Sequence, residues 1–317
     1  MRKSFLFSLC LLLAVSVSAG PHDELYFSNL GLNEGLSQLS VLAICQDSDG
    51  FMWFGTRNGL NRYDGHKMVV YKHDDDDPGS LTDNYILSLA EDRQHRLWIG
   101  SMNGLSRLDL ISGEMKTWPP GISPALQNRV SALCCDNQGR IWIGTSHGLF
   151  QYLEEQDDFR PETLGGIVED VKISAVRETA GHGLVVCTLD RGFVETDPDL
   201  TRPVHHDVRE PDHPLPSSMV NNVFEDSRGA LWVAFRESGL LRLSPDGTRS
   251  EFSAKNGALK ANNVRCLAET DGILYIGTDN GLHTCDLGTG TFDVPASHQH
   301  RSGELSHFSI YSCLTDP

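Results

Sequence analysis

Short apolar runs separated by polar turns recur along this chain, and they predict short β-strands. The first such unit opens with the apolar run 41–44, which the polar turn 47–50 ends. An aromatic strand is expected next, and Asn58-Gly59 then marks a hairpin, because this pair favours a tight two-residue turn. The four strands predicted for the unit cover residues 41–44, 51–55, 60–64 and 68–71. Beyond the N-terminal segment no stretch sustains a helical period, so a helical solenoid is not expected.

The aromatic strand carries a phrase, Trp-x-Gly-Thr followed by Gly-Leu, that returns along the chain. Five copies cover residues 53–60, 98–105, 142–149, 232–240 and 275–282, and an eroded sixth covers 185–193. In chain order their first residues lie 45, 44, 43, 47 and 43 positions apart. A repeat of this period with four short strands is typical of a propeller blade. We therefore predict an all-β β-propeller of about seven four-stranded blades, in which the repeated Trp, Gly and Leu pack each blade on the next.

The end of the chain restarts the repeat. Units open with a β-branched residue at positions 41, 86, 130, 220, 264 and 310, and the segment 310–316 matches 130–136. A turn and an aromatic strand would come next, but the sequence ends at Pro317. We therefore expect six complete blades and the first strand of a seventh. The predicted propeller domain covers 23–317, is truncated in its seventh blade, and belongs to a longer natural protein.

Residues 1–19 have the features of a secretory signal peptide. Arg2 and Lys3 precede an apolar stretch over 5–17, and small residues up to Ala19 fit a cleavage site. The apolar stretch is too short to span a bilayer comfortably, and no later apolar run is long enough. The mature chain is therefore expected to be periplasmic, on the extracytoplasmic side of the inner membrane, without membrane contact of its own.

The chain is acidic, with 26 basic and 43 acidic residues and a formal net charge of −17. Removal of Arg2 and Lys3 with the signal peptide changes this to −19. Such a charge argues against nucleic acid as a partner, while it leaves room for one local basic pocket. Seven cysteines follow the signal peptide, and we interpret them mostly as small buried apolar residues, with their pairing left open. No Cys-x-x-Cys occurs, so neither a metal nor another cofactor is predicted.

The sequence contains none of the common catalytic motifs. There is no Gly-x-Ser-x-Gly, no His-Glu-x-x-His and no phosphate-binding loop. Histidines gather in the polar segments 205–213 and 298–307, whose composition favours exposed loops over a metal site. The recurrent Asp47, Asp92, Asp136 and Asp226 are expected to cap turns. No catalytic residue is therefore predicted.

The loops that lead into the innermost strands surround one mouth of a propeller's central channel, where binding sites of all-β folds commonly lie. Asn recurs just before these strands, and it either caps the turn or binds ligand. Its neighbours vary in kind. An aromatic ring, amides and an Arg that can hold a carboxylate or sulfate would suit a sugar site. The candidate ligand-binding residues are Asn84, Tyr85, Asn128, Arg129, Asn263 and Arg265.

The repeated phrase resembles the two-component regulator propeller repeat. Residues 47–63 match its pattern Asp-x-x-Gly-x-x-Trp-Ile-Gly-Thr-x-x-Gly-Leu-x-Arg-Tyr at almost every fixed position, and 92–108 and 136–152 match closely. The link 77–84 also resembles the family's connection between blades. Departures from the pattern are Val185, Cys187 and Thr179 in the fourth blade, His95 in the second and Ala234 in the fifth.

This resemblance implies the extracytoplasmic sensor part of a hybrid two-component histidine kinase of gut Bacteroidetes, which responds to an oligosaccharide released from a polysaccharide. It also implies a homodimer of the full-length sensor. The kinase domains would lie beyond this chain, so no enzymatic activity is expected of the chain itself. Two alternatives stay open. One is a secreted propeller enzyme, either a glycan lyase or a quinone-dependent dehydrogenase, and the other is a purely structural propeller whose ligand is captured elsewhere in the protein.

Overall fold

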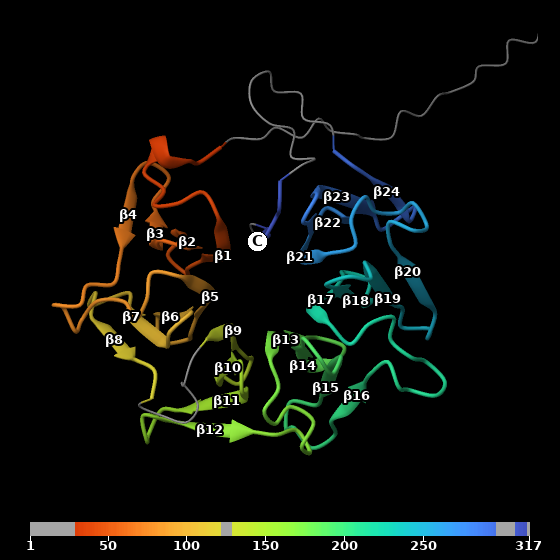
Figure 1. The fold of residues 1–317 in the computed structure, drawn as a ribbon, viewed down its shortest axis with the longest axis horizontal. Helices are drawn as coiled ribbons and strands as arrows, with labels where there is room; N and C mark the ends of the chain where they lie inside the picture. Colours follow the sequence, from red (N-terminus) through yellow and green to blue (C-terminus); the bar gives the residue numbers. More distant parts are fainter. Residues whose placement is uncertain (1–28, 122–128, 296–307, 316–317) are drawn as a thin grey trace, which may run out of the picture.

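The computed structural model describes residues 29–121, 129–295 and 308–315. The predicted signal peptide over 1–19 and the candidate residue Asn128 lie outside these ranges, as does the histidine-rich segment 298–307. The described strands form six antiparallel four-stranded sheets, each in chain order from the centre outward. Figure 1 shows the sheets as blades around a common centre. The β-propeller architecture predicted from the repeat is thus confirmed.

The blades follow one another along the chain. Blade one contains β1 (Val41–Gln46), β2 (Met52–Thr56), β3 (Gly59–Tyr63) and β4 (Met68–Tyr71), after a short 3-10 helix η1 (Leu32–Glu34). Blade two contains β5 (Ile86–Glu91), β6 (Arg96–Ser101), β7 (Leu105–Asp109) and β8 (Met115–Trp118). Blade three contains β9 (Val130–Cys135), β10 (Ile141–Thr145), β11 (Gly148–Leu153) and β12 (Asp158–Glu162). Blade four contains β13 (Ile173–Thr179), β14 (Gly183–Thr188), β15 (Phe193–Thr196) and β16 (Val204–His206). Blade five contains β17 (Val220–Glu225), β18 (Leu231–Phe235), β19 (Leu240–Leu243) and β20 (Arg249–Phe252). Blade six contains β21 (Val264–Thr270), β22 (Ile273–Thr278), β23 (Gly281–Asp286) and β24 (Thr291–Asp293).

The innermost strands begin where the repeat places them. The starts predicted at residues 41, 86, 130, 220 and 264 are confirmed, and the eroded fourth blade begins at Ile173. In that blade Val185 replaces the usual Trp and is fully buried. The Thr179 hydroxyl replaces the usual Asp and donates to the Gly183 carbonyl oxygen at 3.3 Å. Within the described ranges, no helix has the length and apolar character needed to cross a bilayer.

The segment 308–315 follows the path of a seventh innermost strand, although no strand is assigned to it. In Figure 1 it lies between β21 and β1. The Gly281 N–H donates to the Phe308 carbonyl oxygen at 2.9 Å, just as the Gly59 N–H donates to Asn84 at 2.7 Å in blade one. The described C-terminal residues therefore hold the position of a seventh blade, without the partner strands that would complete its sheet.

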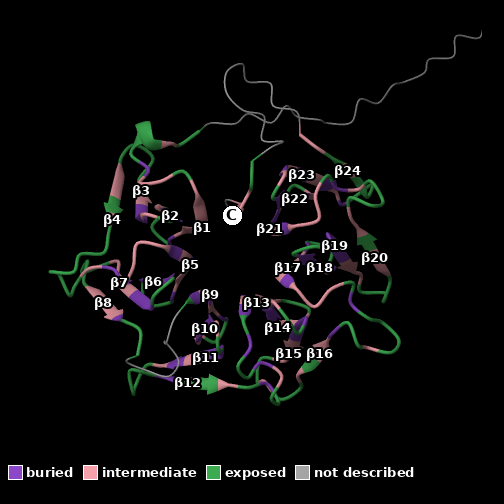
Figure 2. Ribbon diagram, viewed as in Figure 1, coloured by how far each residue is buried: buried purple, intermediate pink, exposed green. Residues whose placement is uncertain are grey.

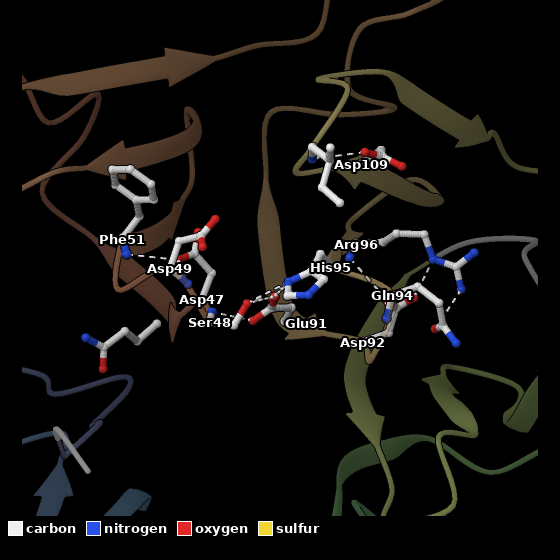
Figure 3. Close-up of polar contacts among 12 residues, drawn as sticks. Asp47, Ser48, Asp49, Phe51, Glu91, Asp92, Gln94, His95, Arg96 and Asp109 are labelled. Carbon is white, nitrogen blue, oxygen red and sulfur yellow. Dashed lines mark hydrogen bonds and ion pairs between the residues drawn. The ribbon is translucent and has the colours of Figure 1, made fainter.

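A buried aspartate shapes the turn between the first two strands in four of the blades. Asp47 Oδ2 accepts a hydrogen bond from the Trp53 indole Nε1 at 2.7 Å, and its Oδ1 accepts from the Phe51 N–H at 2.8 Å. Figure 3 shows this turn beside that of blade two. The same indole bond, at 2.7–2.8 Å, joins the pairs Asp92–Trp98, Asp136–Trp142 and Asp226–Trp232. The aspartates therefore satisfy buried donors, which explains their recurrence.

The hydrophobic core lies between neighbouring blades. One cluster of buried side chains joins each successive pair from blade one to blade six. In Figure 2 the buried residues accordingly gather on the strands, while the peripheral loops are exposed. The Gly of Trp-x-Gly is required by this close approach, because a Cβ on Gly144 would lie 2.5 Å from Ile173 Cγ2 of the next blade. The predicted packing role of the repeated residues is confirmed.

In several blades, the turn between the first two strands also donates hydrogen bonds to a glutamate carboxylate of the following blade. The Ser48 N–H and Oγ donate to the Glu91 carboxylate at 2.7 and 2.6 Å, and the same Oγ lies 2.9 Å from His95 Nδ1 (Figure 3). His95 stands where Gly is usual and takes a φ of 58°. Equivalent acceptors for the turns of blades three, four and five are Glu178, Glu225 and Glu269.

Candidate ligand-binding site

Three residues of each blade lie at one mouth of the central channel. We call the residue just before the innermost strand the entry position, the second residue of that strand the inner position, and the residue just after the second strand the hairpin position. In blades two to six the hairpin N–H donates to the entry carbonyl oxygen, as Arg236 does to Met219 and Leu189 does to Lys172, both at 3.0 Å. The backbone of the mouth is therefore nearly constant, while its side chains vary.

The inner position coincides with a β-bulge. Register shifts skip this residue in the pairing of the first two strands, for example Leu42 between Val41 and Ala43. A bulge re-aims a side chain, and here it turns one residue per blade toward the channel. Around the ring the inner residues that line the channel are Leu42, Leu87, Ser131, Ser174, Asn221, Arg265 and Tyr311. The channel is thus apolar beside blades one and two and polar beside blades three to six.

These positions combine into one cavity of about 490 Å³ at the mouth. Its polar and aromatic lining comes from blades three to six and the C-terminal segment. The entry residues are Arg129, Lys172 and Asn263, the inner residues are Ser131, Ser174, Asn221, Arg265 and Tyr311, and the hairpin residues are Ser146 and Arg236. No His, Asp or Glu is among the described residues that line it. The cavity therefore presents four cationic side chains together with amides and hydroxyls.

Some polar side chains of the cavity form hydrogen bonds with one another, and others are free to bind a ligand. Asn221 Nδ2 donates to the Val264 carbonyl oxygen at 2.7 Å and to Asn263 Oδ1 at 3.0 Å, which fixes both amides. The Arg265 guanidinium carbon lies 4.7 Å from the centroid of the Tyr311 ring. Arg265 Nε is buried and has no hydrogen-bond partner among the described residues. A buried hydrogen-bond donor without a partner costs free energy. The Arg265 Nε is therefore suited to donate to an acceptor atom of a bound ligand.

The structure brings three of the predicted site residues together. Arg129, Asn263 and Arg265 line the cavity. Tyr85 has an entry position in blade two, with the Arg57 guanidinium 5.6 Å from its ring centroid, and does not line this cavity. Asn84 accepts a hydrogen bond from the His73 N–H at 2.9 Å, so its amide caps a loop. Asn128 lies outside the described residues.

Two cationic residues of the cavity escaped the sequence analysis. Lys172 was missed because the first strand of the eroded fourth blade was not placed. A signal existed, since Val185 lies twelve residues after Ile173, as Trp142 does after Val130. Arg236 was missed because it follows the second strand rather than preceding the first. Only the hydrogen bond between hairpin and entry positions shows that these two sets of residues share one mouth.

Among the residues that the structure describes, histidine and cysteine form no metal site at the mouth. His205 and His206 lie on β16, the outermost strand of blade four. Among the described residues, no group of three or more His, Cys, Asp or Glu is arranged to hold a metal ion.

Comparison with known proteins identifies the repeats. The family model described as two component regulator propeller matches residues 35–58, 80–103 and 125–147, which contain the first two strands of blades one, two and three. Each of these three segments is similar to the two component regulator propeller repeat. Among curated proteins, Histidine kinase P4 of Formosa agariphila is 39% identical over 84 residues, which are 26% of this chain and 6% of that protein.

Solved structures share the β-propeller fold. The extracellular domain of a putative hybrid two-component system from B. thetaiotaomicron has a TM-score of 0.72 at 20% identity, over 90% of this chain and 38% of that one. The extracellular domain of a putative one-component system from the same organism has a TM-score of 0.68 at 20% identity, over 87% of this chain and 38% of that one. This chain thus spans well under half of each neighbour.

Proposed function

We propose that this regulator propeller is the ligand-sensing part of an extracytoplasmic sensor in a two-component histidine kinase, and that it binds an oligosaccharide at the channel mouth. The proposal includes a periplasmic location and a homodimer of the full sensor. Signalling then requires that the ligand favour one arrangement of the two chains over another, because a ligand shifts an equilibrium only by its differential affinity.

The observation that carries the proposal is the contrast between scaffold and mouth. The residues that recur in most blades take part in packing and turn formation, as the Asp47–Trp53 bond illustrates. The residues at the entry, inner and hairpin positions differ between blades and converge on one cavity. Its amides, hydroxyls and the Tyr311 ring match the hydroxyl groups and apolar faces of a sugar. A volume of about 490 Å³ is also within the usual range of small-molecule sites.

A binding role suits this cavity better than a catalytic one. General acid–base catalysis in a lyase or hydrolase most often uses His, Glu or Asp within hydrogen-bond reach of the substrate. The described lining of the cavity has none of these three residue types. The lining therefore supports the sensor over the propeller-enzyme alternative.

A binding screen tests the proposal. The purified chain is titrated by calorimetry with neutral and acidic oligosaccharides from plant, algal and host polysaccharides. We expect at least one to bind, and Asn221→Ala and Asn263→Ala each to weaken binding about 5-fold or more, as loss of a hydrogen bond predicts. Asn137→Ala is the matched control, because Asn137 is exposed in a turn at the opposite end of blade three. Absence of binding, or binding that both mouth variants leave unchanged, would refute the proposal.

A further inference from the structure

The mouth cavity is strongly basic in a chain that is strongly acidic. Four cationic residues from four successive blades line it, namely Arg129, Lys172, Arg236 and Arg265. The whole sequence has a formal net charge of −17, with 26 basic residues against 43 acidic ones. Four positive charges around one cavity without a lining carboxylate repel one another, and a bound anion would relieve that repulsion. The concentration of positive charge at this one cavity therefore points to an anionic ligand.

Several cations elsewhere in the propeller form salt bridges with carboxylates, whereas the four cations of the cavity do not. Arg96 contacts the carboxylates of Asp92 and Glu154 at 2.7 Å, and Arg140 contacts Asp136 at 2.5 Å. Within the described part of the chain, none of the four cavity cations is in a salt bridge. The nearest acids in sequence are Glu237, which follows Arg236, and Asp170, two residues before Lys172; both are exposed and do not line the cavity.

Arg265 is the best prepared of the four to bind an anion. Its guanidinium lies against the Tyr311 ring, and a stacked guanidinium keeps its planar edge available for a bidentate acceptor. Its buried Nε has no partner among the described residues. Carboxylate and sulfate groups present paired oxygens that match such a fork, whereas a neutral sugar hydroxyl offers a single weaker acceptor.

We propose that the ligand of this cavity is an acidic oligosaccharide, whose carboxylate or sulfate is held by Arg265 and Arg236 with support from Arg129 and Lys172. This inference rests on the proposed function and adds the chemical class of the ligand. A long polyanion such as nucleic acid is disfavoured, because the rest of the surface is acidic and would repel it. The four cations line a cavity of about 490 Å³, which suits one anionic group on a small sugar.

Matched pairs of sugars test the charge requirement. Digalacturonate is compared with its neutral methyl ester, and galactose 6-sulfate with galactose, by calorimetry on the purified full chain. We expect the acidic member of at least one pair to bind about tenfold or more tightly than its neutral counterpart, because charge-assisted hydrogen bonds exceed neutral ones. The two pairs separate a carboxylate from a sulfate ligand. Added salt should weaken the acidic member's binding more than the neutral one's.

Substitutions then assign the effect to the cavity. Arg265→Gln and Arg236→Gln should each lower affinity for the acidic sugar about tenfold, while Arg265→Lys should keep part of the preference because it keeps the charge. Arg228→Gln is the control, since Arg228 is exposed in the turn between β17 and β18, at the opposite end of blade five. Thermal unfolding of each variant checks that it is folded.

The outcomes separate this inference from the proposed function. Binding of neutral sugars as tightly as acidic ones, unaffected by Arg265→Gln and Arg236→Gln, would overturn the anionic class and leave an oligosaccharide sensor standing. Failure of every acidic and neutral sugar in both screens would overturn both. Acidic preference that vanishes in the two Gln variants but not in Arg228→Gln would establish the inference.

Discussion

The carboxylate of Asp47 accepts hydrogen bonds from a buried indole and from two backbone N–H groups of its own turn. The donors are Trp53 Nε1 at 2.7 Å, Phe51 N at 2.8 Å and Asp49 N at 3.1 Å. We predict that Asp47→Ala lowers the free energy of unfolding by about 1–3 kcal/mol, because it leaves a buried indole donor without a partner. Urea unfolding followed by tryptophan fluorescence measures the change.

Asp49→Ala in the same turn provides the control. Asp49 is exposed and contributes only its backbone N–H, so its substitution should change stability by less than about 0.5 kcal/mol. Equal effects of the two substitutions would contradict the assigned role of Asp47.

The turn aspartates could be predicted from sequence because they recur at a constant distance before the aromatic residue. The same logic predicted that Arg129, Asn263 and Arg265 belong near one mouth. Sequence could not reveal that Arg265 stacks on Tyr311, because that contact depends on the bulge that turns Arg265 into the channel. A bulge adds a residue without leaving a distinct mark in the hydrophobic pattern.

Blade packing depends on the glycine that follows the aromatic residue by two positions. A Cβ on Gly100 would lie 2.8 Å from the Val130 carbonyl oxygen and 2.7 Å from Val130 Cγ1, so the backbone of the next blade would have to move. We predict that Gly100→Ala lowers the free energy of unfolding by about 1–3 kcal/mol, as overpacking of a core does. Chemical denaturation measures it.

Gly79→Ala is the matched control for this prediction. Gly79 is exposed in a loop, and the nearest atom to its added Cβ, Asp77 Oδ1, is 3.2 Å away on a flexible side chain. A change below about 0.5 kcal/mol is expected there. A similar loss at both glycines would mean that the effect of Gly100→Ala comes from backbone entropy or local strain rather than from packing between blades.

Blade four contains a polar cluster that makes its stability depend on pH. Glu195 accepts hydrogen bonds from His182 Nδ1 at 2.6 Å and from His206 Nε2 at 2.5 Å. Burial alone would raise the pKa of Glu195, but the two histidines outweigh it and lower the pKa to about 2. The hydrogen bond to Glu195 raises the pKa of His182, against the opposing effect of burial. Glu225 adds to this rise, and Glu210 lies 3.4 Å from His206 on its far side.

The two pKa shifts act in opposite pH ranges. The raised pKa of His182 stabilises the fold below about pH 6.5, and this contribution is lost as the pH rises through the folded-state pKa. The lowered pKa of Glu195 stabilises above about pH 4.5, and this contribution is lost as the pH falls toward 2. We predict that Glu195→Gln costs more stability at about pH 5.5 than at about pH 8.5.

Urea unfolding at the two pH values measures this difference. His213→Gln is the control, because His213 is exposed and should show no such pH dependence. A cost of Glu195→Gln that is the same at both pH values would contradict a charged pair with His182.

The elements of the fold were largely predictable, and blade four shows the limit. Its phrase has lost Trp and Gly, so the first strand was not located, yet Val185 and Cys187 are fully buried and the four strands form. The apolar side chains of Val185 and Cys187 are buried at the same positions of the repeat, so the blade packs although the usual Trp and Gly are missing. Pattern recognition follows residue types, whereas packing requires only apolar side chains of suitable volume.

At the scale of the whole molecule, the order of blades determines which residues meet. The innermost strands contact one another in chain order from β1 to β21, and Figure 1 shows the segment 308–315 completing the inner circle between β21 and β1. Each mouth residue therefore faces neighbours about one repeat away in sequence. The ring of blades follows from the sequence repeat. The basic character of one side of the mouth depends instead on residues that vary between repeats, so only the structure revealed it.

The same ring geometry brings two distant cysteines together. Cys266 lies on β21 and Cys313 in the C-terminal segment, and their Sγ atoms are 2.6 Å apart. The sequence analysis left cysteine pairing open, since first strands of different blades need not be neighbours, but these two blade positions are adjacent. The hydrogen bond with Cys313 and burial raise the pKa of the Cys266 thiol well above its usual range, so little of this thiol is in the reactive thiolate form at neutral pH.

We predict that oxidising conditions join Cys266 to Cys313 and so tie the C-terminal segment to blade six. The disulfide would close a loop between residues 47 positions apart and should raise the free energy of unfolding by about 2–4 kcal/mol. Peptide mapping without reductant should recover the linked peptides. The Cys313→Ser variant should unfold at a lower urea concentration than the oxidised chain and at the same urea concentration as the reduced chain. Cys45→Ser should leave the link intact, because Cys45 lies on β1 of blade one and packs against the cluster between blades one and two. Free thiols at both 266 and 313 after air oxidation would show that the C-terminal segment does not rest against β21 in solution.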